Sequence, residues 1–241
     1  LPYLIGCVLF AFSIFLPLKT LYSESSRLTV MGSCLDRIEG VFGEKTLPDN
    51  GKKHIPATSS APEIAFENVT FAYGEEDTVH NVSFTAEKNT MTALVGPSGG
   101  GKTTLANLLA RFWDIKSGSI KVRGVDIRDV PLSELMDKIS MVFQRVYLFQ
   151  DTVYNNIAMG RPTATKEEVE EAARKARCYD FIMNLPQGFD TVIGEGGASL
   201  SGGEKQRISI ARCILKDAPI VILDEATASV DLDNERHIQE A

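Results

Sequence analysis

The first eighteen residues form an uninterrupted apolar run. Residues 1–18 include no charged side chain, and Lys19 follows them directly. A run of this length is at the lower limit for a helix that spans a bilayer. It lacks the basic stretch and the small-residue cleavage site of a signal peptide. We interpret it as the end of a transmembrane helix that earlier spans precede. A buried hydrophobic helix is the alternative, and Pro2 and Pro17 favour it to some extent.

A different pattern follows Lys19. Apolar residues recur there every three or four positions, at Leu21, Leu28, Met31, Leu35, Ile38 and Phe42. This spacing predicts a helix with one packing side that continues the apolar run, so that residues 1–42 form one element. Residues 43–62 contain three prolines and two glycines and show no period, which predicts a linker.

From Glu63 onwards the pattern alternates between strands and helices, which is typical of an α/β fold. The apolar run 91–95 predicts a strand, and Leu105, Leu108, Leu109 and Phe112 have helical spacing. Between them lies a G-x-x-x-x-G-K-T string, the pattern of a phosphate-binding loop whose backbone N–H groups surround phosphate oxygens. A glycine-rich turn with a chance lysine is the less favoured alternative. The predicted nucleotide-binding residues are Gly96, Pro97, Ser98, Gly99, Gly100, Gly101, Lys102, Thr103 and Thr104.

The predicted charged and metal-binding residues of the site come from this loop and from a second segment. Lys102 places a positive charge at the β and γ phosphates, and the Thr103 hydroxyl can ligate Mg²⁺. A second apolar run, 219–223, predicts a buried strand that ends in Asp224 and Glu225. Asp224 would then hold Mg²⁺ beside the loop, and Glu225 would polarise the attacking water. Without the loop, two acids after a strand would indicate only a solvated turn.

A second anion-binding helix start is predicted at Ser201, Gly202 and Gly203, within the segment 200–204. One nucleotide needs only one phosphate loop. We therefore expect this second group to contact the γ-phosphate held by a different copy or a partner domain.

Residues 96–103, 200–204 and 220–225 together resemble, in order and spacing, the ATP-binding cassette of ABC transporters. The resemblance implies a P-loop NTPase cassette over 63–241, with a mixed sheet core and a helical subdomain at about 145–199. It also implies that Tyr73 stacks on adenine, although a simple strand aromatic is equally consistent with this position. Gln144 would sense Mg²⁺ and the attacking water, and Asp231 would belong to a loop that crosses the dimer interface.

The stretch 146–161 and the Gly194–Gly196 tripeptide resemble the exporter branch of this family, and residues 1–62 resemble its junction between membrane domain and cassette. A capping box at Thr165 and Glu168 fits a helix of the helical subdomain. The resemblance implies an ATPase in which two cassettes hold two ATP molecules, each between the Lys102 loop of one and the Ser201 group of the other. It implies a second half-transporter, identical or different, and a multi-pass protein of the cell membrane with its cassette on the cytoplasmic side. The exported substrate would be a small molecule, a lipid, a peptide or a siderophore.

Two departures from the family pattern are visible. Glu204 stands where many members carry Gln, a common variant. The family's switch histidine lies some thirty residues beyond the catalytic glutamate, and His237 is too close to Glu225 to be that residue. We therefore expect the chain as given to lack this phosphate sensor and at least one strand, and to be inactive by itself.

Composition narrows the choice of partner. The chain has 25 Lys and Arg against 32 Asp and Glu, a formal charge of −7, so no overall basic field attracts nucleic acid. We expect no nucleic-acid partner, and a soluble non-transport ABC ATPase that acts on nucleic acid or ribosomes is the runner-up interpretation. An importer cassette or a degenerate, binding-only cassette is less favoured. The four cysteines are too widely spaced for a disulfide framework or a CxxC metal site.

Overall fold

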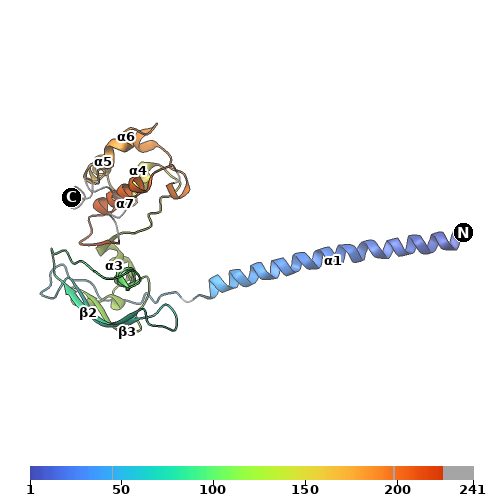
Figure 1. The fold of residues 1–241 in the computed structure, drawn as a ribbon, viewed down its shortest axis with the longest axis horizontal. Helices are drawn as coiled ribbons and strands as arrows, with labels where there is room; N and C mark the ends of the chain where they lie inside the picture. Colours follow the sequence, from blue (N-terminus) through green and yellow to red (C-terminus); the bar gives the residue numbers. More distant parts are fainter. Residues whose placement is uncertain (45, 198, 225–241) are drawn as a thin grey trace. The chain divides into compact units, whose positions relative to one another are not determined.

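The first part of the chain is one long helix. The computed structural model describes residues 1–44, 46–197 and 199–224, and it divides into two units, Leu1–Pro48 and Asp49–Ala241. The first unit contains α1 (Pro2–Gly43), which continues through Pro17 (Figure 1). Its 42 residues correspond to about 63 Å, roughly twice the thickness of a bilayer core. By length and composition α1 can cross a membrane.

The second unit opens with an antiparallel sheet in the order β2-β1-β3-β4. Its strands are β1 (Ile64–Phe71), β2 (Val79–Ala86), β3 (Ser117–Val122) and β4 (Val125–Asp126). Helices α2 (Lys102–Leu109) and α3 (Leu132–Lys138) add the fully buried Leu108 and Leu135 to its apolar core, and η1 (Ile127–Asp129) follows β4. Because α2 begins at the predicted phosphate loop, burial of Leu108 anchors that loop to the sheet.

A separate parallel pair carries the second half of the predicted site. β5 (Ile139–Val142) pairs with β6 (Ile220–Leu223), with Val142 opposite Leu223. The strand predicted at 219–223 is therefore confirmed. It is not buried as we expected, since Val221 and Leu223 are more than half exposed.

The strand predicted at residues 91–95 is wrong in this structure. These residues form no strand, and Met91 and Val95 are almost fully exposed. An apolar run favours a strand only when a neighbouring strand supplies hydrogen-bond partners. Among the described residues β5 and β6 pair only with each other.

The remaining helices are grouped together (Figure 1), and their buried apolar side chains form a second core. They are α4 (Val153–Ala158), α5 (Lys166–Lys175), α6 (Tyr179–Met183) and α7 (Gly202–Lys216), with η2 (Gly188–Asp190) and η3 (Glu195–Gly197). The predicted capping box is confirmed, because the Glu168 N–H donates to the Thr165 hydroxyl and the Thr165 N–H to the Glu168 carboxylate. This core includes Ile208, Ala211 and Leu215 of α7, which lie beyond the range 145–199 predicted for the helical subdomain.

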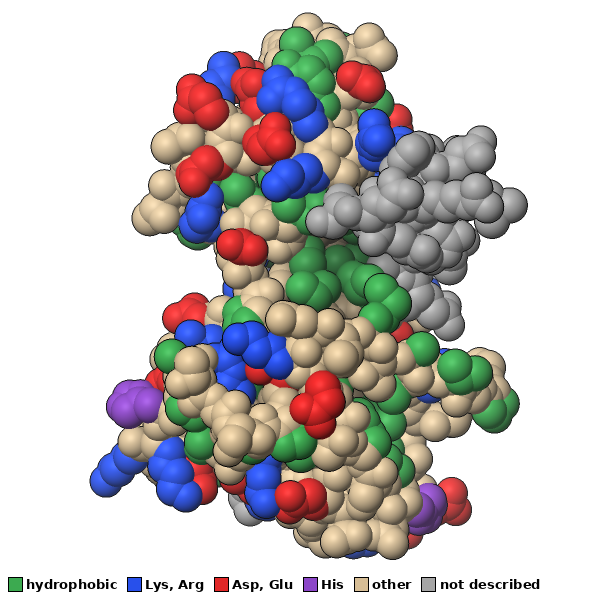
Figure 2. Space-filling view, turned by 90° about the vertical axis from the view of Figure 1, so that its left-hand side faces the viewer, with side chains coloured by type: hydrophobic (Ala, Val, Ile, Leu, Met, Phe, Trp, Pro, Cys, Tyr) green, Lys and Arg blue, Asp and Glu red, His purple; other side chains and the backbone are tan. Residues whose placement is uncertain are grey.

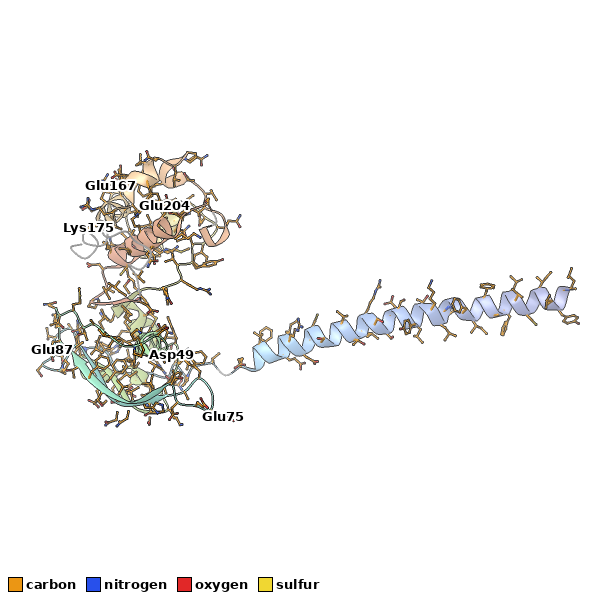
Figure 3. The ribbon with its side chains drawn as sticks, in the orientation of Figure 1. Asp49, Glu75, Glu87, Glu167, Lys175 and Glu204 are labelled. Atoms are coloured by element: carbon orange, nitrogen blue, oxygen red, sulfur yellow. The ribbon has the colours of Figure 1, made fainter. Side chains whose placement is uncertain are left out.

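Residues 49–59, which we call the docking segment, pack on the sheet-bearing part of the second unit; Asp49 is labelled in Figure 3. The Leu132 N–H donates to Asp49 Oδ1 at 2.8 Å, which caps α3 from outside the helix. The Ile55 N–H donates to Glu134 Oε1 at 2.8 Å, and the Ile55 side chain is buried. A Cβ on Gly51 would lie 2.3 Å from the Val130 carbonyl carbon, so the close approach requires glycine. The range predicted as a linker, 43–62, thus extends well into the second unit.

Arg123 joins the docking segment to the sheet. Its guanidinium donates to the carbonyls of Pro56 and Ala57 at 3.0 Å each and pairs with Glu63 at 2.9 Å. The Arg123 and Glu63 side chains are each about nine-tenths buried. Removal of one member of such a pair leaves the other charge buried without a partner.

We therefore expect Arg123→Met to lower the free energy of unfolding of the second unit by about 3 kcal/mol. Chemical denaturation followed by circular dichroism measures this change. Lys121→Met is the matched control, because Lys121 lies on β3 two residues before Arg123 and pairs with Glu67 at a partly exposed position. Its expected cost is below about 1 kcal/mol. Equal losses of unfolding free energy for the two substitutions would show that the buried pair stabilises the protein no more than the exposed pair does.

A candidate nucleotide-binding site

The predicted phosphate loop folds around its own lysine. Lys102 Nζ donates to the carbonyl oxygens of Gly96 at 3.0 Å and Pro97 at 2.9 Å. Gly99 and Gly101 have φ of 77° and 83°, a left-handed conformation that favours glycine. Gly101 is the residue that precedes the first turn of α2. The ammonium group, the left-handed turn and the helix start therefore lie in one short segment.

The remaining predicted residues of this loop differ in exposure. The side chain of Thr104 is buried in the first turn of α2. Pro97, Ser98 and Gly100 are exposed, and the Gly100 N–H donates to the Pro97 carbonyl at 3.1 Å. The loop therefore leaves its outer surface open to solvent.

The structure brings Thr103 and Asp224 together across 121 positions of sequence. Thr103 Oγ1 donates to Asp224 Oδ1 at 3.0 Å. Thr103 is in the first turn of α2, and Asp224 follows the last residue of β6. The phosphate loop and the predicted magnesium carboxylate thus meet in one place.

Gln144 lies near the same edge of the β5–β6 pair. The two strands are parallel, and the Asp224 N–H donates to the Val142 carbonyl at 3.0 Å. Gln144 comes two residues after Val142. Parallel strands end at a common edge, so the backbones that carry Gln144 and Asp224 leave the sheet side by side.

Tyr73 follows β1 and has two aromatic neighbours. Its ring centroid lies 4.8 Å from that of Phe71 and 5.2 Å from that of Trp113, with interplanar angles of 87° and 90°. Phe71 is buried, whereas the Tyr73 and Trp113 side chains are about half exposed. The Tyr73 ring is therefore held from inside the protein and remains accessible to solvent.

Ser201 begins α7 through a complete capping box, which confirms the predicted helix start. The Glu204 N–H donates to Ser201 Oγ at 3.3 Å, and the Ser201 N–H donates to Glu204 Oε2 at 2.7 Å. The Ser201 N–H first, and second the Ser201 hydroxyl, which donates to Glu204 Oε2 at 2.8 Å, hold the pKa of the Glu204 carboxyl below its usual value. Gly202 and Gly203 form the first turn of α7. Glu204 lies in the helical part of the second unit, as do Glu167 and Lys175 (Figure 3).

Two predicted residues, Glu225 and Asp231, lie outside the described residues. Their roles remain predictions.

A buried polar network escaped the sequence analysis. Arg212 of α7 donates through Nε to the Asn156 carbonyl at 2.5 Å and through Nη1 to the Tyr147 carbonyl at 2.9 Å. The Asn156 side chain, fully buried in α4, also bonds both the N–H and the carbonyl of Phe149. Burial lowers the pKa of Arg212 to about 10. The network fixes the chain between Gln144 and α4, and no local pattern in the sequence indicates it.

The chain matches the ABC transporter family over residues 79–228. It is therefore a member of that family, in agreement with the cassette fold and with the motifs described above. Members of this family bind ATP, and hydrolysis of ATP is the characteristic activity of its exporters.

Similar proteins are exporters of much greater length. An ATP-dependent lipid A-core flippase of Desulfotalea psychrophila is 45% identical over 229 residues, which are 92% of this chain and 40% of the flippase. A putative multidrug export ATP-binding/permease protein of Bacillus subtilis is 43% identical over 227 residues, 93% of this chain and 39% of the relative. A bacterial Atm1-family ABC exporter solved with ATP bound has a TM-score of 0.79 and 39% identity over 86% of this chain and 36% of its own. The chain thus spans about two fifths of these proteins, and they do not favour the soluble, ribosome- or nucleic-acid-acting alternative.

Proposed function

We propose that this chain is the ATP-hydrolysing part of an ABC exporter, joined through α1 to its membrane domain. The observation that carries the proposal is the hydrogen bond between Thr103 and Asp224, because it unites the phosphate loop with a carboxylate at the end of β6. A hydroxyl and a carboxylate in contact are the pair that a magnesium nucleotide requires at a P-loop.

The residues of the site fit the Mg²⁺ ion that we propose for it. Mg²⁺ is usually held by one or two carboxylates together with substrate phosphates, rather than by a cage of protein ligands. Within the described part of the chain, no cluster of three or more His, Cys, Asp or Glu side chains could hold a metal alone. Thr103, Asp224 and Gln144 would be the protein ligands of the ion. When bound, the ion neutralises phosphate charge.

The other site residues would bind the phosphates, stabilise their negative charge and position the attacking water. Lys102 would exchange its bonds to the Gly96 and Pro97 carbonyls for phosphate oxygens, and the N–H groups of residues 99–104 would surround the same oxygens. Glu225 would accept a proton from water, and Gln144 would orient that water. These are contributions of position and electrostatics, which phosphoryl transfer mainly requires.

Two cassettes would complete each site. All hydrogen bonds described for the Ser201 side chain go to Glu204, within its own capping box. The exposed Ser201 at the start of the fifteen-residue helix α7 supports its use by the γ-phosphate of a second copy or a partner half-transporter. Asp231 would lie at the interface between the two cassettes.

The transport role rests on α1 and on the relatives. α1 has no charged side chain from Pro2 to Leu18, as a membrane helix requires. The relatives are named for a lipid A core and for multidrug export, which favours a lipid or a small hydrophobic molecule as substrate. On the face seen in Figure 2, acidic and basic side chains are interspersed, which does not favour a polyanionic partner there.

Membrane fractionation combined with an ATPase assay tests this function. We expect the complete transporter to stay in the membrane after a carbonate wash, and to hydrolyse ATP there in a reaction that EDTA stops. Lys102→Ala is the control for contaminating ATPases, because it removes the phosphate-binding charge and leaves α1 unchanged. Release of the protein by carbonate, together with sedimentation with ribosomes, would contradict the exporter function.

A further inference from the structure

Trp113, the only tryptophan of the chain, belongs to no motif of the predicted site and yet contacts one of its residues. Its ring is perpendicular to that of Tyr73 at 5.2 Å and lies 6.3 Å from the ring of Phe71. Neither neighbour lies parallel to the Tyr73 ring in a stack, and about half of the Tyr73 side chain is exposed. Three aromatic rings of this kind restrict one another's rotation and still leave Tyr73 available to a planar ligand.

The turn that carries Trp113 is tied to the loop that carries Tyr73. The Lys116 N–H donates to the Thr70 carbonyl at 3.0 Å, and Lys116 Nζ bonds Asp77 at 2.8 Å. Arg111, almost fully buried, bonds Asp114 at 3.0 Å within the same turn. The turn therefore holds both sides of the Tyr73 loop, and Trp113 has little freedom to leave the ring.

The Tyr73 loop in turn reaches the phosphate loop. The Thr78 N–H donates to the Phe71 carbonyl at 2.8 Å and so closes the Tyr73 loop. A Cβ on Gly101 would lie 3.4 Å from the Thr78 carbonyl oxygen and from Val79. Helix α2 begins at Lys102 and leads, after Leu109, directly into the turn of Trp113. The phosphate loop and the aromatic rings are thus connected in two ways, through the close approach of Thr78 to Gly101 and through α2.

We propose that Trp113 is a positioning residue for nucleobase recognition, which holds the Tyr73 ring at the angle that accepts the adenine base. This inference rests on the proposed function. Because Trp113 would act through Tyr73, it affects the binding of ligands that carry a base and has no effect on phosphate alone.

Binding measurements with two ligands test the proposal. In the complete transporter we expect Trp113→Ala to weaken Mg-ATP binding by about 3- to 10-fold, the range of one aromatic pair contact. Binding of inorganic tripolyphosphate and kcat at saturating ATP should stay unchanged, and Trp113→Phe should restore ATP binding to within about 2-fold. Phe149→Ala is the matched control, because Phe149 forms a similar perpendicular pair with Tyr147 outside this site. Trp113→Leu replaces Trp113→Ala if circular dichroism shows that the alanine variant is unfolded.

A double-mutant cycle and a fluorescence signal distinguish a Trp113 that positions Tyr73 from a Trp113 that only stabilises the fold. In a Tyr73→Ala background, Trp113→Ala should cause no further loss of ATP affinity. In the parent protein, ATP should change the tryptophan fluorescence, and both Trp113→Phe and Tyr73→Ala should abolish that change. The role of Trp113 would be overturned if Trp113→Ala lowered ATP affinity equally in the parent and in the Tyr73→Ala background. It would also be overturned if Trp113→Ala lowered tripolyphosphate affinity as much as ATP affinity. A parent protein that binds neither ligand would overturn the proposed function as well.

Discussion

Replacement of Glu225 by glutamine in the complete transporter is expected to reduce ATP turnover by about 10²- to 10⁴-fold. Glu225 follows Asp224 directly, and Asp224 is hydrogen-bonded to Thr103. A carboxylate next to the proposed magnesium ligand can accept a proton from the attacking water, whereas an amide of the same shape cannot. Phosphate release measured in membrane vesicles gives the turnover.

The same variant should still bind ATP. The phosphate loop and its lysine are unchanged by Glu225→Gln, so the Kd for Mg-ATP should stay within about 3-fold of the parent value. Equilibrium binding of a labelled nucleotide measures it. Turnover near the parent rate would remove Glu225 from the role of general base, and a parallel loss of ATP binding would instead assign it to nucleotide or metal binding.

Asp224→Asn is expected to have the second largest effect on catalysis. Loss of a ligand or of its supporting carboxylate commonly lowers metal affinity or activity by about 10- to 100-fold. Asn keeps the shape of Asp224 and can still contact the Thr103 hydroxyl, so the change mainly removes negative charge beside the proposed metal position. We therefore expect the ATPase rate at 1:1 Mg-ATP to fall by about this factor, and part of the loss to be recovered at high Mg²⁺.

The matched control is Asp217→Asn, the same substitution seven positions earlier. Asp217 ends α7 in a left-handed conformation with φ of 52°, which Asn tolerates well, and its side chain is exposed. Asp217→Asn should leave both the ATPase rate and its dependence on Mg²⁺ unchanged. A loss for Asp224→Asn that is independent of Mg²⁺ concentration would mean that Asp224 supports the fold of the loop and not the metal.

Some elements were accessible from sequence because their causes are local. The starts of α5 and α7 each depend on a hydroxyl and a glutamate three positions apart, and the contacts occur as expected. The phosphate loop needs glycines and a lysine within eight consecutive residues, and its turn takes the left-handed conformation that those glycines permit. Long apolar length likewise predicts α1.

Other predictions failed, or could not be made, because pairing between distant segments decides them. An apolar run at 91–95 could not indicate whether a neighbouring strand would pair with it. Prolines in 43–62 suggested a linker, while the contacts of the docking segment with Arg123, Leu132 and Glu134 require residues more than sixty positions away.

The sequence alone therefore located the short motifs of this protein: a glycine loop with its lysine, an acidic strand end and a serine-capped helix. These features are short, and their backbone conformations follow from a few adjacent side chains. Only the tertiary structure decided that Thr103 meets Asp224, that Arg123 holds the docking segment, and that Trp113 packs on Tyr73. Each of these contacts joins segments whose approach depends on burial of a shared core, which no local pattern encodes.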